Sequence, residues 1–164
     1  MQSTVAFDST SLFNFATVGR VGLLVNPFRE RAFIVEQVRI EIENGLPGKP
    51  DPRVYKGSEW LQLTEATGAS ELRLLEIYRD TVFGRDRNQG EAETLAVCKE
   101  RSWRCITDDH EALEVAKQHG IQALTTANVL SWLAAMGMLS GKDAKDIATE
   151  MRRLGRPVDP ADVV

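Results

Sequence analysis

The chain has few of the residues that build thiolate metal centres or disulfide frameworks. Its 164 residues include two cysteines, Cys98 and Cys105, and two histidines. Because no CxxC pair or Cys/His ligand spacing surrounds the cysteines, a structural zinc site is excluded. Two thiols without a disulfide framework indicate buried apolar cysteines and a reducing cytoplasm.

Long apolar runs and an excess of positive charge are also missing. No segment approaches the roughly 20 apolar residues that span a bilayer, and MQSTVAFDSTSLFNF lacks the basic-then-apolar order of a signal peptide. We therefore expect a cytoplasmic protein that does not contact a membrane. A net charge of −4 argues against a protein that grips nucleic acid by bulk positive charge. It does not exclude a nuclease, because bound cations reverse the field of an acidic pocket.

The remaining composition is that of an ordinary globular protein, with strands and helices in alternation. A hydrophobic content of 43% in 164 residues predicts a single domain over residues 1–164. We expect strands at about 5–7, 31–35, 60–63, 105–107 and 121–124. Helices are expected at about 12–16, 35–44, 72–78, 90–101, 111–119, 128–136 and 142–154, the last as a candidate dimer or partner element. The segments 46–56 and 84–90 read as loops. This alternation predicts an α/β fold, a three-layer α/β/α sandwich with a central parallel sheet.

Acidic residues follow two of the predicted strands at the point where each strand ends. Asp8 follows the first strand, and Asp108 and Asp109 follow the strand that ends at Thr107. The carboxyl ends of parallel strands lie on one edge of a sheet, where ligands bind in such folds. We therefore expect these carboxylates to lie close together.

Three further acids lie on helices that approach the same edge. Glu91 and Glu93 are in the first turn of the 90–101 helix, and Glu41 lies late in the 35–44 helix. Crowded carboxylates raise one another's pKa unless cations join them. Oxygen ligands in an open cluster suit Mg²⁺ or Mn²⁺, which keep bound waters and contact substrate phosphates.

Each acid also has a simpler structural interpretation. Asp8 could cap the helix that follows it, and Asp108 with Glu111 matches a capping box. The two glutamates of the 90–101 helix would stabilise its dipole, and the acid on the charged 35–44 helix could be a solvated residue. A single acid therefore does not establish a site.

Together the motifs resemble those of a PIN domain. The opening Asp8-Ser9-Thr10-Ser11-Leu12, followed by NFATVGRVGLL, is similar to the start of that family. Gly90-Glu91-Ala92-Glu93 and Thr107-Asp108-Asp109 resemble the GExE and DD motifs of one branch. Val38-Arg39-Ile40-Glu41 fits the family's second acidic position, and HEALEVAKQHGIQALTTANVL follows the style of the branch. The resemblance covers roughly residues 5–139.

The resemblance implies a ribonuclease that depends on Mg²⁺ or Mn²⁺. The implied catalytic acids are Asp8, Glu41, Glu91 and Asp109. The wider set of candidate metal ligands is Asp8, Glu41, Glu91, Glu93, Asp108 and Asp109. One or two ions held there would activate a water and stabilise in-line displacement at an RNA phosphodiester. Glutamate replaces the commoner third acid, with Glu91 slightly favoured over Glu93; Asp109 fits the fourth position better than Asp108.

Hydroxyls and arginines near these acids have candidate supporting roles. Ser9, Thr10 or Thr107 could hydrogen-bond a ligating carboxylate or a bound water, although helix capping is the simpler explanation of these hydroxyls. Arg85 and Arg87, in the loop before Glu91, are candidate RNA contacts. The resemblance further implies a VapC-type toxin of a type II toxin–antitoxin pair, a homodimer inhibited by a small antitoxin protein.

Two other functions compete with this one. A non-catalytic PIN-type module would bind RNA or protein without cutting, but all four acidic positions are filled. A receiver-like signalling domain would need a lysine after its last strand to balance a phosphoryl group. Here Leu124 is followed by Thr125, Thr126 and Ala127, so the ribonuclease is the preferred hypothesis.

Overall fold

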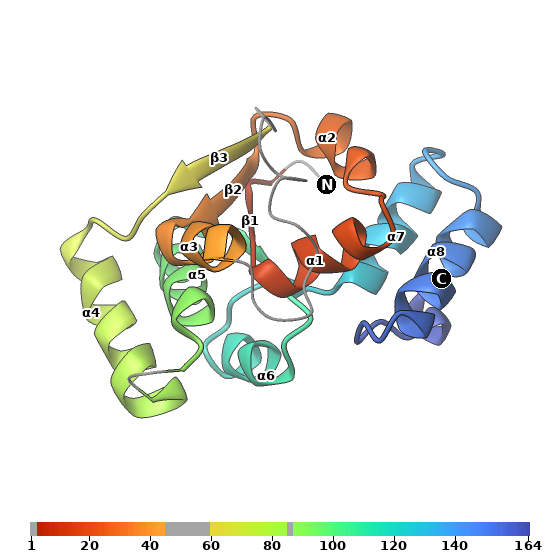
Figure 1. The fold of residues 1–164 in the computed structure, drawn as a ribbon. Helices are drawn as coiled ribbons and strands as arrows, with labels where there is room; N and C mark the ends of the chain where they lie inside the picture. The colour runs from red at the N-terminus through yellow and green to blue at the C-terminus, as the bar shows by residue number, and fades with distance from the viewer. Residues whose placement is uncertain (1–2, 45–59, 85–86) are drawn as a thin grey trace.

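A computed structural model of the chain describes residues 3–44, 60–84 and 87–164, and in these ranges the strands form one five-stranded sheet (Figure 1). The strands are β1 (Val5–Phe7), β2 (Ala32–Val35), β3 (Leu61–Thr64), β4 (Arg104–Ile106) and β5 (Ala123–Leu124). They are ordered β3-β2-β1-β4-β5, and every neighbouring pair is parallel. The predicted parallel sheet is confirmed.

Helices cover both faces of this sheet. They are α1 (Ser9–Thr17), α2 (Gly22–Phe28), α3 (Glu36–Asn44), α4 (Ala69–Ile77), η2 (Tyr78–Phe83), α5 (Gln89–Arg101), α6 (His110–Gln118), α7 (Thr126–Ala135), α8 (Gly141–Arg153) and η3 (Pro160–Asp162). Successive side chains of a strand point to opposite faces. Val5 and Phe7 accordingly pack with residues of α1, α2 and α7, whereas Ala6 packs with residues of α4, α5 and α6. The three-layer sandwich is therefore confirmed.

The register of the two central strands positions the carboxyl edge. Phe7 of β1 lies beside Ile106 of β4, and the Asp8 N–H donates to the Ile106 carbonyl at 2.9 Å. The hydroxyl of Ser11, one turn into α1, lies 2.9 Å from both the Asp8 and the Ile106 carbonyl oxygens. These contacts fix the start of α1 to the end of β4, so Asp8 and Thr107 face each other across the edge.

Several elements differ from the sequence-based expectations. The short helix α2 was not predicted, and it contains Pro27 next to its last residue. Pro27 reduces the stability of this short helix only a little, because it removes a single backbone hydrogen bond in the final turn. Beyond α4 the chain continues as a π-helical turn, η2. The expected loop 46–56 lies outside the described residues, as do residues 85 and 86 of the expected loop 84–90. None of the helices in the described ranges is long and apolar enough to cross a membrane.

Candidate metal centre

Asp8 occupies the junction between β1 and α1. Its side chain is fully buried, and its Oδ1 accepts a hydrogen bond from the Ser9 backbone N–H at 2.7 Å. Oδ2 accepts from the hydroxyls of Thr10 at 2.7 Å and Thr107 at 3.0 Å. Burial raises the pKa of Asp8 despite these three donors, and the nearby charge of Asp109 adds to the shift. Asp8 is thus both the N-cap of α1 and a fixed, buried carboxylate.

Two threonine hydroxyls set the orientation of Asp8. Thr10 Oγ1 accepts from the Asp108 N–H at 3.3 Å, and Thr107 Oγ1 accepts from the Asp109 N–H at 3.1 Å. Each hydroxyl therefore has its own proton available for the Asp8 carboxylate. The hydroxyls of Thr10 and Thr107 therefore hold the Asp8 carboxylate, a candidate metal ligand, in place. Ser9 also holds this carboxylate, through its backbone N–H.

Glu91, in the first turn of α5, is a strongly perturbed carboxylate at this edge. It is 9% exposed, and its pKa is raised to about 8, chiefly by burial and then by the charge of Asp8. The charges of Glu41 and Asp109 raise the pKa further. Four acids, from the β1–α1 junction, α3, α5 and the β4–α6 junction, therefore share one electrostatic environment.

Glu41 and Asp109 reach this environment from two different helices. Glu41 is half-buried on α3, and its Oε1 accepts from the Gly90 N–H of α5 at 3.2 Å. Asp109 is the N-cap of α6, with Oδ1 accepting from the Ala112 N–H at 2.8 Å. The cap uses the Oδ1 atom of Asp109. The charge of Asp109 nevertheless raises the pKa values of Asp8 and Glu91. A cap and a metal-binding role are therefore compatible at Asp109.

Glu93 lies apart from these four acids. Its carboxylate accepts from the Gln37 N–H in the first turn of α3 at 3.1 Å, and from the Ala66 N–H after β3 at 3.2 Å. Residues two apart on a helix point to nearly opposite faces, so Glu93 faces away from the side of α5 that carries Glu91. The structure places Glu93 as an anchor between α5, α3 and the segment after β3.

Asp108 is also engaged by neighbouring helices. Its Oδ1 accepts from the Thr126 N–H at 3.0 Å, and its Oδ2 accepts from the Asn14 side-chain amide at 2.8 Å and from the Thr126 hydroxyl. Burial raises the pKa of Asp108 to about 6. The capping box with Glu111 does not form; Glu111 instead accepts from the Asn88 amide. Asp108 joins α1 to the start of α7.

Asn14 and Arg156 support this junction, and sequence reasoning missed both. Arg156 Nε donates to Asn14 Oδ1 at 2.6 Å, and an Arg156 terminal nitrogen donates to the Thr10 carbonyl at 3.2 Å. The Asn14 amide nitrogen is thereby directed at Asp108 and at the Thr126 hydroxyl, 3.0 Å away. The segment after α8 is thus connected to the helix that follows Asp8. No local pattern indicates a contact between residues so far apart in the chain.

The structure describes one of the two candidate RNA contacts, Arg87. Arg85 lies outside the described residues. The Arg87 side chain is 75% exposed just before α5, and one of its nitrogens lies 4.0 Å from a Glu111 carboxylate oxygen. Arg87 is therefore a solvent-facing cation beside the start of α6, near the capping residue Asp109.

The donor set at this edge fits a hard divalent cation. The four candidate ligands are all carboxylates, and burial makes the charged forms of Asp8 and Glu91 unfavourable until a cation is present. Within the described ranges, no three Asp, Glu, His or Cys side chains already form a group that could hold a metal ion. The fit therefore rests on the chemistry and mutual electrostatics of Asp8, Glu41, Glu91 and Asp109.

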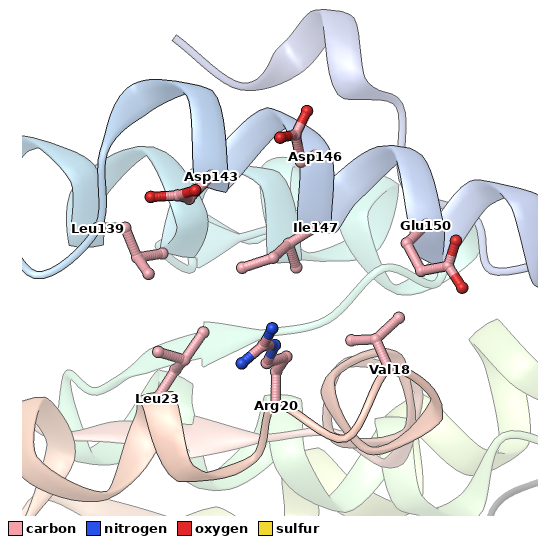
Figure 2. Close-up of a pocket in the computed structure, with 8 residues that line it drawn as sticks. All are labelled: Val18, Arg20, Leu23, Leu139, Asp143, Asp146, Ile147 and Glu150. Atoms are coloured by element: carbon pink, nitrogen blue, oxygen red, sulfur yellow. The ribbon is translucent and has the colours of Figure 1, made fainter.

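A groove away from these acids lies between α8 and the turn joining α1 to α2 (Figure 2). It is a groove of about 500 Å³, lined by Val18, Arg20 and Leu23 on one side and by Leu139, Asp143 and Ile147, among others, on the other. None of the six candidate metal ligands lines it. The groove is a separate surface feature.

The fold and this group of acids at the carboxyl edge define a PIN-type module. The sequence matches the DUF3368 family, described as a PIN domain, over residues 4–162, and the chain belongs to that family. PIN domains are generally nucleases, so membership of the family indicates a nuclease-like module. The resemblance to the PIN family is confirmed, whereas the VapC-like branch and its GExE and DD motifs remain predictions.

A solved structure has the same fold. The crystal structure of PAE2754 from Pyrobaculum aerophilum superimposes with a TM-score of 0.57 at 18% sequence identity, covering 82% of this chain and 98% of that chain. At this identity the likeness concerns the fold alone. None of the curated protein sequences compared with the chain matches it.

Proposed function

We propose that this protein is a divalent-metal-dependent endoribonuclease whose ions, Mg²⁺ or Mn²⁺, are held by Asp8, Glu41, Glu91 and Asp109. One observation carries the proposal: Glu91 is buried beside three other carboxylates, and its pKa is raised to about 8. At neutral pH such a group keeps its proton unless a bound cation stabilises its ionised form. Perturbed acids of this kind are typical of functional sites.

The side chains at this edge have distinct parts in the proposed reaction. Bound ions would lower the pKa of water and stabilise charge at a phosphodiester. Asp8 is held in one orientation by Ser9, Thr10 and Thr107, so its carboxylate needs little rearrangement to bind a cation. Glu91 would release its proton when the cation binds, because the cation reverses the local preference for the neutral acid.

RNA is the proposed substrate, with Arg85 and Arg87 contacting its phosphates. The support for Arg87 is its exposure beside the start of α6; that for Arg85 is its place in the sequence before α5. Phosphate contacts by such cations would offset the chain's net charge of −4 near the site. Replacement of Arg87 should therefore weaken RNA binding most at low salt.

We also propose that the protein is the VapC-like toxin of a type II toxin–antitoxin pair in the cytoplasm. It would form a homodimer and be inhibited by a small antitoxin protein. Membership of the PIN family and the presence of all four acids support this assignment. Residues 1–164 would act as a single domain, with α8 as a candidate contact element, because it packs on α7 at the side of the molecule (Figure 1).

A non-catalytic PIN-type module that binds RNA or protein is the second candidate. One observation favours it: the described residues contain no preformed group of three metal-binding side chains. Such a module would bind its partner equally well with and without divalent cations. Its binding would also be insensitive to Glu91→Gln.

The test is cleavage of an end-labelled RNA pool of mixed sequence with Mn²⁺, with Mg²⁺ and with EDTA. Wild type should cut with either ion, whereas EDTA or Asp8→Asn should abolish cutting. Glu43→Gln is the matched control, because Glu43 is exposed and paired with Arg39 on the same helix as Glu41. RNA binding without cutting under every condition would contradict the nuclease and favour the module. Equal cutting of single-stranded DNA would contradict the assignment to RNA.

A further inference from the structure

We infer that Gly90 is a positioning residue for Glu41, and the metal-binding part of this inference rests on the proposed function. A Cβ atom built on Gly90 would lie 2.6 Å from Glu41 Oε1 and 3.1 Å from Glu41 Cδ. It would also lie 3.0 Å from Cγ2 of Val38. Any side chain at position 90 therefore competes with the Glu41 carboxylate for the same space.

Backbone conformation does not explain this glycine. Gly90 is buried in the first turn of α5 and is not among the described glycines with positive φ. Glycine inside a helix is less favourable than alanine, so the position has a local disadvantage that something else must offset. The close approach of α3 to α5 supplies the reason, because only a residue without a Cβ leaves room for Glu41.

Gly90 also holds the carboxylate that it admits. Its backbone N–H donates to Glu41 Oε1 at 3.2 Å. N–H groups in the first turn of a helix have no acceptor within the helix and stabilise nearby anions. The missing Cβ and this N–H therefore act together, keeping Glu41 on the side of α3 from which its charge raises the pKa of Glu91.

The segment Gly90-Glu91-Ala92-Glu93 thus has three separate tasks. Gly90 fixes Glu41, Glu91 contributes its carboxylate to the acidic group, and Glu93 accepts from the Gln37 N–H at the start of α3. Gln37 and Glu41 are four residues apart, so α5 contacts α3 at two points about one turn apart. The motif therefore sets where α3, and with it Glu41, lies relative to the carboxyl edge.

A first test uses the metal-free protein and does not depend on any activity. The amide proton of Gly90 is followed by ¹⁵N–¹H NMR in wild type, Glu41→Ala and Glu43→Ala. Glu41→Ala should shift this resonance upfield, because the amide loses its acceptor, whereas Glu43→Ala should leave it in place. An unchanged resonance in Glu41→Ala would overturn the inference whatever the protein does with metals.

A second test asks whether position 90 acts on metal through Glu41. Mn²⁺ is titrated calorimetrically into Gly90→Ala, Glu41→Gln and the double variant. Gly90→Ala should fold, since the flexible end of Glu41 can swing away, but its Mn²⁺ affinity should fall about 10–100-fold, as expected when a ligand loses its support. The double variant should bind no more weakly than Glu41→Gln, because the displaced carboxylate is already absent.

Gly141→Ala is the matched control, because Gly141 also opens a helix and a Cβ there would meet nothing within 4 Å. It should bind Mn²⁺ like wild type. Unchanged affinity in Gly90→Ala, or losses that add in the double variant, would overturn the positioning role. A wild type that binds no Mn²⁺ would instead overturn the proposed function, and the amide shift would then decide the Gly90–Glu41 contact alone.

Discussion

Neutralising Glu91 should stabilise the metal-free protein, and more so as the pH rises. In the folded protein the pKa of Glu91 is raised from 4.5 to about 8, chiefly by burial. Between these two values the folded state keeps a proton that the unfolded state has lost. Each pH unit in this window therefore reduces the free energy of unfolding by up to about 1.4 kcal/mol. Below pH 4.5 both states are protonated at Glu91, so the effect is absent there.

The full effect is reached above pH 8. There the ionised Glu91 lowers the free energy of unfolding by up to about 5 kcal/mol, a limit set by the size of the pKa shift. Relaxation of the site and entry of water reduce this figure, so we expect a few kcal/mol. Glu91→Gln removes the ionisable group and should flatten the pH dependence by this amount. The variant should match wild type at pH 4.5 and exceed it at pH 8.5.

The assay is urea unfolding in EDTA at intervals between pH 4.5 and 8.5. Glu43→Gln, an exposed site, should follow the wild-type curve throughout. Adding Mn²⁺ should reverse the order at neutral pH, because the cation stabilises the ionised site in wild type. Parallel curves for wild type and Glu91→Gln in EDTA would refute the reasoning, since they would show that Glu91 is not a buried acid among like charges.

Other substitutions test the supporting contacts. Glu93→Gln should lower the free energy of unfolding by about 1–3 kcal/mol, because the Glu93 carboxylate accepts hydrogen bonds from two backbone N–H groups. Urea unfolding at pH 7 measures this change. An unchanged unfolding midpoint would contradict the role of Glu93 as an anchor between α5 and α3. Thr107→Val should reduce Mn²⁺ affinity about 10–100-fold in calorimetry, because Asp8 loses a hydrogen-bond donor. A Thr107→Val variant that binds Mn²⁺ as tightly as wild type would contradict this supporting role of Thr107. Arg101→Met should destabilise the fold by about 2 kcal/mol, since it leaves the buried Glu71 carboxylate unpaired. The pKa of Glu71 is lowered to about 2 by Arg101, so that loss should be full at pH 7 and shrink as the pH falls from 4.5 towards 2. A pH-independent loss would contradict this pairing.

The sheet and the carboxyl edge were predictable because they depend on local patterns. Short β-branched runs alternate with helical periodicity, which indicates parallel strands. Asp8 directly follows one such run and the pair Asp108-Asp109 follows another, so parallel pairing alone brings these acids to one edge. The observed pairing of β1 with β4 places Asp8 and Thr107 within hydrogen-bonding distance.

The choice between neighbouring acids was not available from the sequence. Glu91 and Glu93 occupy the same helical turn, so helical spacing does not separate them. Only the packing of α5 against α3 and the segment after β3 shows that the Glu93 carboxylate accepts hydrogen bonds from two backbone N–H groups. Asp108 likewise matched a capping box, yet its partners Asn14 and Thr126 come from two helices distant in the chain. Such partners follow from tertiary packing.

Other features depend on long-range approach. The contact of Arg156 with Asn14 joins residues that are 142 positions apart. The need for glycine at position 90 appears only when α3 is packed against α5. Helix α2 was missed because Pro27 and Gly22 both indicate a break, whereas burial of Leu24 and Phe28 in the core favours a helical turn.

The most direct test of the account is calorimetric titration of Mn²⁺ into Glu91→Gln and Glu93→Gln at pH 7. Both variants remove one carboxyl group from the same turn of α5, and the two carboxyl groups lie on different faces of that helix. We predict that Glu91→Gln loses Mn²⁺ binding, whereas Glu93→Gln keeps an affinity close to that of wild type. Equal loss in the two variants, or binding retained in Glu91→Gln, would contradict a metal centre built from Asp8, Glu41, Glu91 and Asp109.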